Sequence, residues 1–187
     1  VAPYKAYVND IPSFQQKTID VYPGESINSV IDKFSSHNLI NKIFIRIFLN
    51  LENISDFKTG EYSIDNKTMK EIIFSMNKGE TITHKLIIKE GANIYEIQDI
   101  INESLLVNDC EYLKCLDNYF PFSEGVLYPD TYFYKKGMNA SVLLKSSNER
   151  LNDFLNILLK DKKIHPMLDK DKILILASII EKEAGNN

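Results

Sequence analysis

Three capped helix starts constrain most strongly what this chain can fold into. Ser26, Thr68 and Asn93 each precede a segment whose apolar residues recur with helical spacing. Thr68 and Asn93 are also followed three positions later by a glutamate, which is the spacing of a capping box. Between the helices, short segments bounded by glycine or proline are typical of strands. The pattern predicts an α+β fold built from short helices and short strands.

The first part of the chain is predicted to form a small module. A strand that ends at Val21 turns through Pro23 and Gly24 into the helix after Ser26, and a short strand is expected at 61–64. A second helix is expected to lie between them, from about residue 41. The residues predicted to face inward on this second helix are Ile43, Ile47, Phe48 and Leu51.

The predicted organisation has three parts, an extended lead-in at 1–20, a first module at 21–80 and a second module at 81–187. In the second module we expect a strand at 81–88, a helix after Asn93, a short helix at 109–117, an aromatic loop at 119–134, and helices at 139–159 and from 169 onward.

Composition and charge disfavour two classes of protein. The chain has a formal net charge of −4 and two arginines against twenty lysines, so it lacks the arginine-rich basic face of a typical nucleic-acid binder. Its longest apolar run, residues 173–180, is far shorter than the roughly 18 residues of a membrane span. Because the chain starts at Val1 and not at methionine, we expect that something upstream has been cut away, and a signal, an anchor or the boundary of a cloned fragment are the alternatives.

Two cysteines, Cys110 and Cys115, lie five positions apart in the short helix expected at 109–117. This spacing does not place them on one line of a helix. Buried free thiols are therefore expected, and a disulfide is the alternative. A metal site is disfavoured, because no further Cys or His lies nearby in the sequence.

An aromatic segment that contains two carboxylates is the first candidate for chemistry. It reads Glu124-Gly125-Val126-Leu127-Tyr128-Pro129-Asp130-Thr131-Tyr132, and Phe120, Phe122, Phe133 and Tyr134 flank it. Pro129 restricts Tyr128 to extended geometry, so a loop or an edge strand is predicted. Aromatic rings that stack on sugar faces, together with carboxylates that accept hydrogen bonds from hydroxyl groups, suit glycan binding. The alternative is a hydrophobic hinge whose aromatic residues form core.

The last predicted helix carries two glutamates, Glu181 and Glu183. At about 100° per residue they point some 200° apart and cannot act as a close pair. Glu181 lies toward Ser178, whereas Glu183 falls on the stripe formed by Ile173, Leu176, Ile179 and Ile180. An acid on an apolar stripe loses hydration, which raises its pKa and suits a general acid. The alternative is a solvated Glu183 at a fraying helix end.

Two stretches of the first module resemble a LysM module, a small βααβ glycan binder. Residues 21–27 read V-Y-P-G-E-S-I, which is similar to the opening of such modules. Residues 60–64 stand where the second strand of the module is expected.

Together the segments resemble the YceG-like family of endolytic murein transglycosylases. Residues 56–62 are similar to the family's F-K-x-G-x-Y strand, and residues 89–91 to its E-G motif. Residues 124–132 resemble its E-G-x-(L/F)-(F/W/Y)-P-D-T-(Y/W) signature, and residues 176–183 its A-S-I-(V/I)-E-K-E helix. The last two motifs are specific at this spacing.

The resemblance implies a LysM-like βααβ module followed by a mixed α/β catalytic domain that is incomplete at its C-terminus. The family cleaves peptidoglycan strands internally between N-acetylmuramic acid and N-acetylglucosamine and leaves a 1,6-anhydromuramoyl end. The resemblance places the catalytic acid at Glu183, in agreement with the helix-face argument. It implies no cofactor or metal, because the substrate supplies its own nucleophile. Residues assigned to sugar binding or to shaping the site are Glu124, Tyr128, Asp130, Tyr132, Ser178 and Glu181.

The resemblance also implies a location and partners. The family is tethered to the cytoplasmic membrane by an N-terminal helix, so we expect an anchor before Val1 and a catalytic domain on the periplasmic side. The expected partners are peptidoglycan strands and a cell-wall synthase, and nucleic acid is not among them.

One departure from the family pattern affects the predicted activity. The family's F-x-N-R-L and L-Q-(T/S)-D motifs do not follow Glu183 in this sequence. If 187 residues were the whole molecule, we would expect an incomplete cleft with little or no activity. The competing interpretation is therefore a non-catalytic glycan-binding or scaffold protein, and a third is an unrelated α+β interaction domain.

Overall fold

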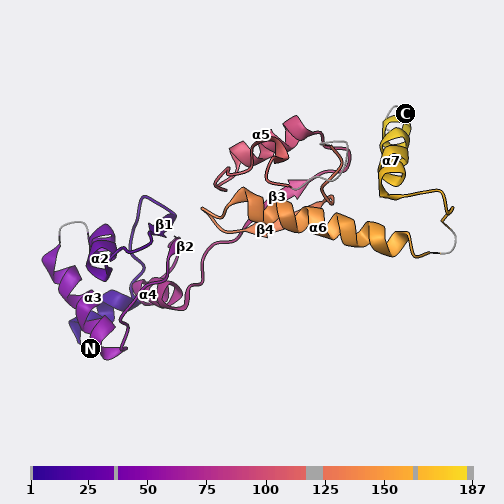
Figure 1. Cartoon of the computed structure of the whole chain (residues 1–187). Coiled ribbons are helices and arrows are strands. Elements are labelled where there is room, and N and C mark those ends of the chain that lie inside the picture. The colour runs from indigo at the N-terminus through magenta and orange to yellow at the C-terminus, as the bar shows by residue number, and fades with distance from the viewer. Residues whose placement is uncertain (1, 36–37, 117–123, 162–163, 185–187) are drawn as a thin grey trace. The chain divides into compact units, whose positions relative to one another are not determined.

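The chain folds into two compact units, seen in a computed structural model that describes residues 2–35, 38–116, 124–161 and 164–184 (Figure 1). The first unit is Val1–Ile82 and the second is Thr83–Asn187. Each combines helices with a two-stranded antiparallel sheet, which confirms the predicted α+β class. Among the described helices, none has both the length and the apolar character needed to cross a membrane.

In the sequence of the first unit, two helices lie between two strands that pair with each other. Its elements are α1 (Pro3–Asn9), β1 (Thr18–Val21), α2 (Ile27–Ser35), α3 (Leu39–Leu51), β2 (Gly60–Ser63) and α4 (Met69–Lys78). β1 pairs with β2 from Thr18 opposite Ser63 to Val21 opposite Gly60. The order β1-α2-α3-β2 is therefore βααβ, and the sheet and helices share one core that includes the fully buried Tyr62.

The predicted extended lead-in at 1–20 is wrong for Pro3–Asn9, which forms helix α1. A proline in the first turn suits a helix start, because its missing N–H would have no partner within the helix. Val8 is buried in the core of the first unit, and the ring of Tyr7 lies 5.9 Å from that of Phe44 on α3. Packing against α3 thus stabilises a helix too short to be stable alone.

The inward face of α3 also differs from the prediction. Phe48 is buried as expected, but Ile43 is 53% exposed and Leu51 is 59% exposed, and Ile47 lies outside the core as well. Ile45 and Leu49 pack inward with Phe48 instead. The helix is apolar around most of its circumference, so helical spacing alone did not distinguish its buried face.

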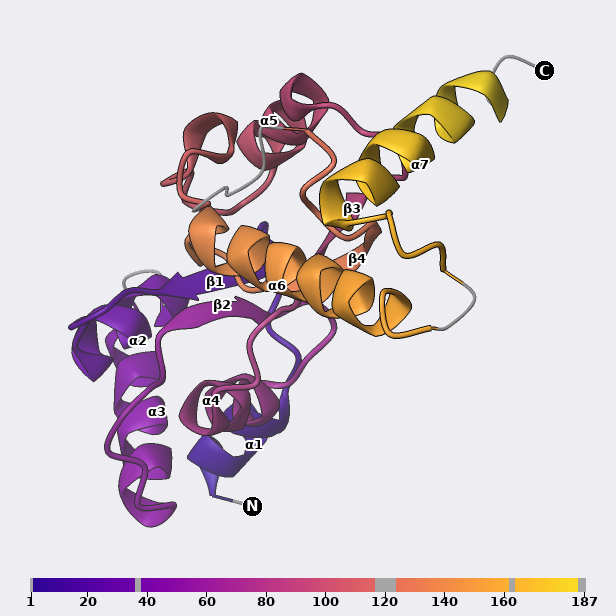
Figure 2. The same cartoon turned by 45° about the vertical axis from the view of Figure 1, so that its right-hand side comes forward.

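The second unit packs helices against a short antiparallel sheet of two strands that lie far apart in the sequence. Its elements are β3 (His84–Ile88), α5 (Ile94–Glu103), the 3₁₀ turn η1 (Glu111–Leu113), β4 (Asp130–Tyr134), α6 (Ala140–Leu158) and α7 (Lys170–Ala184). β3 pairs with β4 from His84 opposite Tyr134 to Ile88 opposite Asp130. Leu86 of β3, Ile101 of α5 and Leu144 of α6 belong to one buried cluster, and α6 runs along the sheet in both views (Figures 1 and 2).

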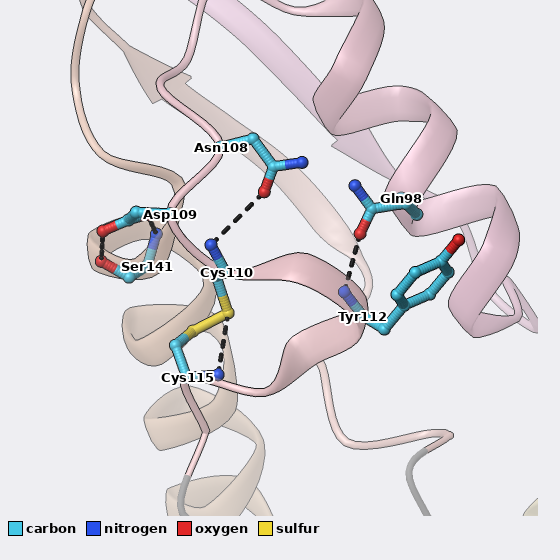
Figure 3. The surroundings of a disulfide bond; sticks show 7 residues. All are labelled: Gln98, Asn108, Asp109, Cys110, Tyr112, Cys115 and Ser141. Carbon is cyan, nitrogen blue, oxygen red and sulfur yellow. Dashed lines mark hydrogen bonds between the residues drawn. A yellow bond between two sulfur atoms is a disulfide. The ribbon is translucent and has the colours of Figure 1, made fainter.

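Cys110 and Cys115 form a disulfide, so the expectation of free thiols is wrong (Figure 3). The helix predicted at 109–117 is wrong for its described residues 109–116, where the 3₁₀ turn Glu111–Leu113 forms in its place. Tyr112 and Leu113 have φ values of 47° and 59°, both left-handed, and the Cα atoms of the two cysteines that flank this turn lie 5.0 Å apart. Gln98 of α5 supports the turn, since its Oε1 accepts the Tyr112 backbone N–H at 2.7 Å.

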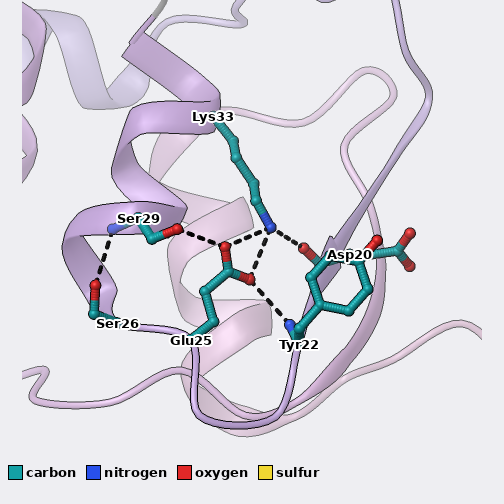
Figure 4. Close-up of polar contacts among 6 residues, drawn as sticks. All are labelled: Asp20, Tyr22, Glu25, Ser26, Ser29 and Lys33. Atoms are coloured by element: carbon teal, nitrogen blue, oxygen red, sulfur yellow. Dashed lines mark hydrogen bonds and ion pairs between the residues drawn. The ribbon is translucent and has the colours of Figure 1, made fainter.

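The carboxylate of Glu25, which is half-buried, holds the turn between β1 and α2 through hydrogen bonds and an ion pair (Figure 4). Glu25 accepts hydrogen bonds from the backbone N–H of Tyr22 at 3.0 Å and from Ser29 Oγ at 2.8 Å, and it pairs with Lys33 Nζ at 2.7 Å. Lys33 also donates to the carbonyl of Asp20 at 2.7 Å. Burial alone would raise the pKa of Glu25, but the bonds from Lys33, Tyr22 and Ser29 outweigh burial and lower the pKa to about 2.

This arrangement predicts an acid-sensitive first unit. A glutamate whose folded pKa is depressed stabilises the fold above its ordinary pKa of 4.5, and that contribution is lost as the pH falls toward about 2. Glu25→Gln should lower the free energy of unfolding by about 1–2 kcal/mol at pH 7. Urea unfolding at pH 7 and at pH 2.5 measures the effect, with Glu52→Gln, an exposed acid in the same unit, as control. If Glu25→Gln lowers the free energy of unfolding by the same amount at pH 7 and at pH 2.5, the role assigned to the Glu25 carboxylate is contradicted.

Candidate functional site

Tyr128, Asp130 and Tyr132 come together at the start of β4, beside α6. The Tyr132 hydroxyl donates to the carbonyl of Tyr128 at 2.7 Å. Asp130 forms an ion pair with Arg150 of α6, and the Arg150 Cζ lies 4.6 Å from the centre of the Tyr128 ring. The backbone N–H of Thr131 and the Arg150 guanidinium lower the pKa of Asp130 below its ordinary value. The ionised carboxylate of Asp130, the guanidinium of Arg150 from α6 and the aromatic rings of the segment therefore lie next to one another.

Two polar side chains of α6 hold this segment in place through hydrogen bonds to its backbone. The Tyr128 N–H donates to Ser147 Oγ at 3.0 Å, and Ser147 is fully buried. Asn148 Nδ2 donates to the carbonyl of Val126 at 2.7 Å. Val126 and Leu127 are buried in the core of the second unit and anchor the motif, whereas Tyr128, Asp130 and Tyr132 are half-buried.

The predicted loop at 119–134 is wrong for Asp130–Tyr134, which forms strand β4, in keeping with the edge strand that the proline allowed. Within the motif, Glu124 is exposed and precedes a turn at Gly125, whose φ is 70°. Phe133 is exposed on β4, whereas Tyr134 is buried. Phe120 and Phe122 were predicted to belong with these aromatic residues. They lie outside the described residues.

Helix α7 carries the other predicted site residues. Glu181 and Glu183 are both exposed, and Ser178 Oγ donates to the carbonyl of Ile175 at 2.8 Å. Glu181 lies against the turn between β3 and α5, because a Cβ on Gly91 would stand 3.3 Å from Glu181 Cγ. The stripe residues Leu176, Ile179 and Ile180 are exposed as well. Glu183 thus lies beside apolar side chains on a solvent-facing helix, and among the described residues no hydrogen bond or ion pair joins it to Tyr128, Asp130 or Tyr132.

Arg150 and Phe154 were not predicted to belong to this group. They lie four positions apart on α6, one turn, and both contact the Tyr128 ring, with the Phe154 centroid 5.8 Å away. The sequence feature that could have identified Arg150 is its rarity, because it is one of only two arginines in the chain. A rare arginine four residues before an aromatic residue on a predicted helix indicates a cation placed for a planar or anionic partner.

The chain belongs to the YceG-like family, since the model of that family matches residues 19–187. This match covers both units, including the strand–turn–helix that begins at β1, the 124–132 segment and α7. The recognition made from the sequence motifs is therefore confirmed at the level of the family. A search of curated proteins finds no match.

The chain is also similar to a solved structure, that of a YceG-like protein from Listeria monocytogenes. The two share 21% sequence identity with a TM-score of 0.35, over 89% of this chain and 64% of the Listeria protein. The chain therefore spans less than two thirds of that relative's length.

Proposed function

We propose that the protein is a lytic transglycosylase that cleaves glycan strands of peptidoglycan internally. The observation that carries the proposal is the family match over residues 19–187, which includes both motifs singled out for chemistry. The surface group of Tyr128, Asp130 and Arg150 supports it, because aromatic rings beside hydrogen-bonding charges suit a sugar ligand.

The proposed mechanism uses Glu183 as acid and then as base. Its carboxylic acid donates a proton to the glycosidic oxygen while the bond from that oxygen to C1 of the muramoyl residue breaks, with an oxocarbenium-like transition state. The resulting carboxylate removes the proton of the C6 hydroxyl, and the C6 oxygen bonds to C1. The products are a strand ending in 1,6-anhydro-N-acetylmuramic acid and a strand with a free hydroxyl, and Glu183 is protonated again.

The remaining site residues are proposed to bind or position the strand. Tyr128 and Tyr132 offer aromatic surface, and Asp130 and Glu124 offer acceptors for sugar hydroxyls. Glu181 is proposed to position the helix, because its side chain lies against the turn at Gly91. Ser178 is proposed to contact substrate through its lone pairs, since its hydroxyl proton is donated to Ile175. A membrane anchor before Val1 and action outside the cytoplasmic membrane belong to the same proposal.

One observation favours a second candidate function, a glycan-binding or scaffold protein without activity. In the described part of the chain, Glu183 is exposed, and so are the apolar residues Leu176, Ile179 and Ile180 on the same helix. The Tyr128 group, by contrast, is firmly held by the fold.

The test incubates purified peptidoglycan with the 187-residue chain and with the product of the whole reading frame, in case that frame continues past Asn187. A transglycosylase releases soluble anhydro-ended fragments, which mass spectrometry identifies. Sedimentation with the glycan but no released fragments from either protein supports the binding function instead. If both proteins fail to bind peptidoglycan and release no fragments, both candidate functions are contradicted.

A further inference from the structure

A cation and an aromatic ring, one turn apart on α6, flank the ring of Tyr128. The Arg150 Cζ lies 4.6 Å from the Tyr128 centroid, and the Phe154 ring packs edge-on at 5.8 Å with an interplanar angle of 65°. Phe154 is 47% exposed, so part of its ring remains open to a ligand. The three side chains form an apolar shelf with a positive charge at one end.

The fold fixes this shelf before any ligand arrives. The Tyr128 backbone is tied to Ser147 through its N–H at 3.0 Å and to the Tyr132 hydroxyl through its carbonyl at 2.7 Å. Arg150 is held in turn by Asp130 and by the face of the Tyr128 ring. A preorganised site of this kind loses little side-chain entropy on binding.

Arg150 keeps hydrogen-bonding capacity toward solvent. Asp130 takes one of its terminal nitrogens, Nη1, and over the described part of the chain no hydrogen bond or ion pair engages Nη2 or Nε. The side chain is 53% exposed. The Nη2–Nε edge of a guanidinium presents two parallel N–H groups, which match the two oxygens of a carboxylate.

We propose that Arg150, Tyr128 and Phe154 form a subsite for a sugar that carries a carboxylate. The sugar ring packs on the exposed part of the Phe154 ring, beside Tyr128, and its carboxylate accepts two hydrogen bonds from the open edge of Arg150. This inference rests on the proposed function, because the muramoyl residue is the acidic sugar of that substrate. Its lactyl carboxylate is free only where the peptide stem is missing, so the subsite selects peptide-free muramoyl units. Carboxylates on the peptide stem are the other source of the same chemistry.

Calorimetric titration of the 187-residue chain with defined glycans tests the subsite. The ligands are a peptide-free N-acetylglucosamine–N-acetylmuramic acid tetrasaccharide, the same tetrasaccharide with its lactyl carboxyls amidated, the peptide-bearing form, and neutral chitotetraose. We expect the native chain to bind the free-carboxylate tetrasaccharide about tenfold more tightly than the amidated one. Tighter binding of the peptide-bearing form would overturn the assignment to the lactyl carboxylate.

Variants assign the preference to one side chain. Arg150→Gln should remove the tenfold preference for the free carboxylate over the amide, and Arg150→Lys should recover only part of it, because an ammonium lacks the planar fork. Arg46→Gln is the matched control, since Arg46 is the other arginine and bonds to Asn28 in the first unit. Circular dichroism establishes that each variant is folded.

The outcomes separate this inference from the proposed function. Equal affinity of the native chain for the free and amidated tetrasaccharides, or an intact preference in Arg150→Gln, overturns the subsite while leaving glycan binding in place. Absence of binding to every glycan overturns the subsite and also contradicts the proposed glycan-directed function.

Discussion

Glu183→Gln is expected to lower the rate at which anhydro-ended fragments form by about three orders of magnitude. The amide has nearly the shape of the acid, but it cannot protonate the glycosidic oxygen and cannot remove the proton of the C6 hydroxyl. Both halves of the proposed mechanism therefore fail together. The substitution is made in the product of the whole reading frame, and initial rates are scored by mass spectrometry of soluble fragments.

The matched control is Glu103→Gln, which neutralises an exposed glutamate at the end of α5. It should retain the native rate, because Glu103 lies outside the proposed site. Since Glu183 is exposed, its substitution should not unfold the chain, and unchanged circular dichroism would establish this. A Glu183→Gln protein that keeps more than a tenth of the native rate would contradict the assignment of the acid.

Tyr62→Ala is expected to destabilise the first unit by about 3–5 kcal/mol. Tyr62 is fully buried at 0% exposure, and its hydroxyl donates to the carbonyl of Lys58 at 2.6 Å. Truncation leaves a cavity in the shared core and also removes the donor for a carbonyl beside the sheet. Tyr62→Phe separates the two effects, because it keeps the ring and should cost only about 1 kcal/mol.

Hydrogen exchange locates this loss of stability. Amides of β1 and β2 should exchange much faster in Tyr62→Ala, whereas those of β3 and β4, in the other unit, should be unaffected. A loss below about 1 kcal/mol for Tyr62→Ala would contradict the central place of this side chain in the core.

Helix starts were the most predictable part of the fold. Both capping boxes read from the sequence are present, with Thr68 and Glu71 at the start of α4 and Asn93 and Glu96 at the start of α5. These motifs are local, because donor and acceptor lie within four residues, so their geometry needs no tertiary information.

Tertiary contacts decided the features that the sequence argument missed. Helix α1 depends on packing of Tyr7 and Val8 against residues that lie far along the chain. The disulfide depends on Tyr112 adopting a positive φ, which residue type alone did not suggest. The buried face of α3 depends on which of several apolar sides packs against α1 and α2. In each case the local pattern allowed more than one answer.

The candidate site was predictable only in part. The motif at 124–132 identified Tyr128, Asp130 and Tyr132, which the structure brings together, and their role in sugar binding stays a prediction. Arg150 was missed because it lies 20 residues from its partner Asp130. The catalytic role of Glu183 likewise stays a prediction, carried by its motif alone, because the apolar residues beside it on α7 are exposed.

Digestion of peptidoglycan in water enriched in oxygen-18 distinguishes attack by the muramoyl C6 hydroxyl from attack by water. If the C6 hydroxyl of the muramoyl residue closes on C1, as the account predicts, new ends contain one water less than hydrolysed ends and carry no oxygen-18. Mass spectrometry of the fragments released by the product of the whole reading frame reads out both properties at once. New reducing ends labelled with oxygen-18 would show that water is the nucleophile and would contradict the proposed transglycosylase.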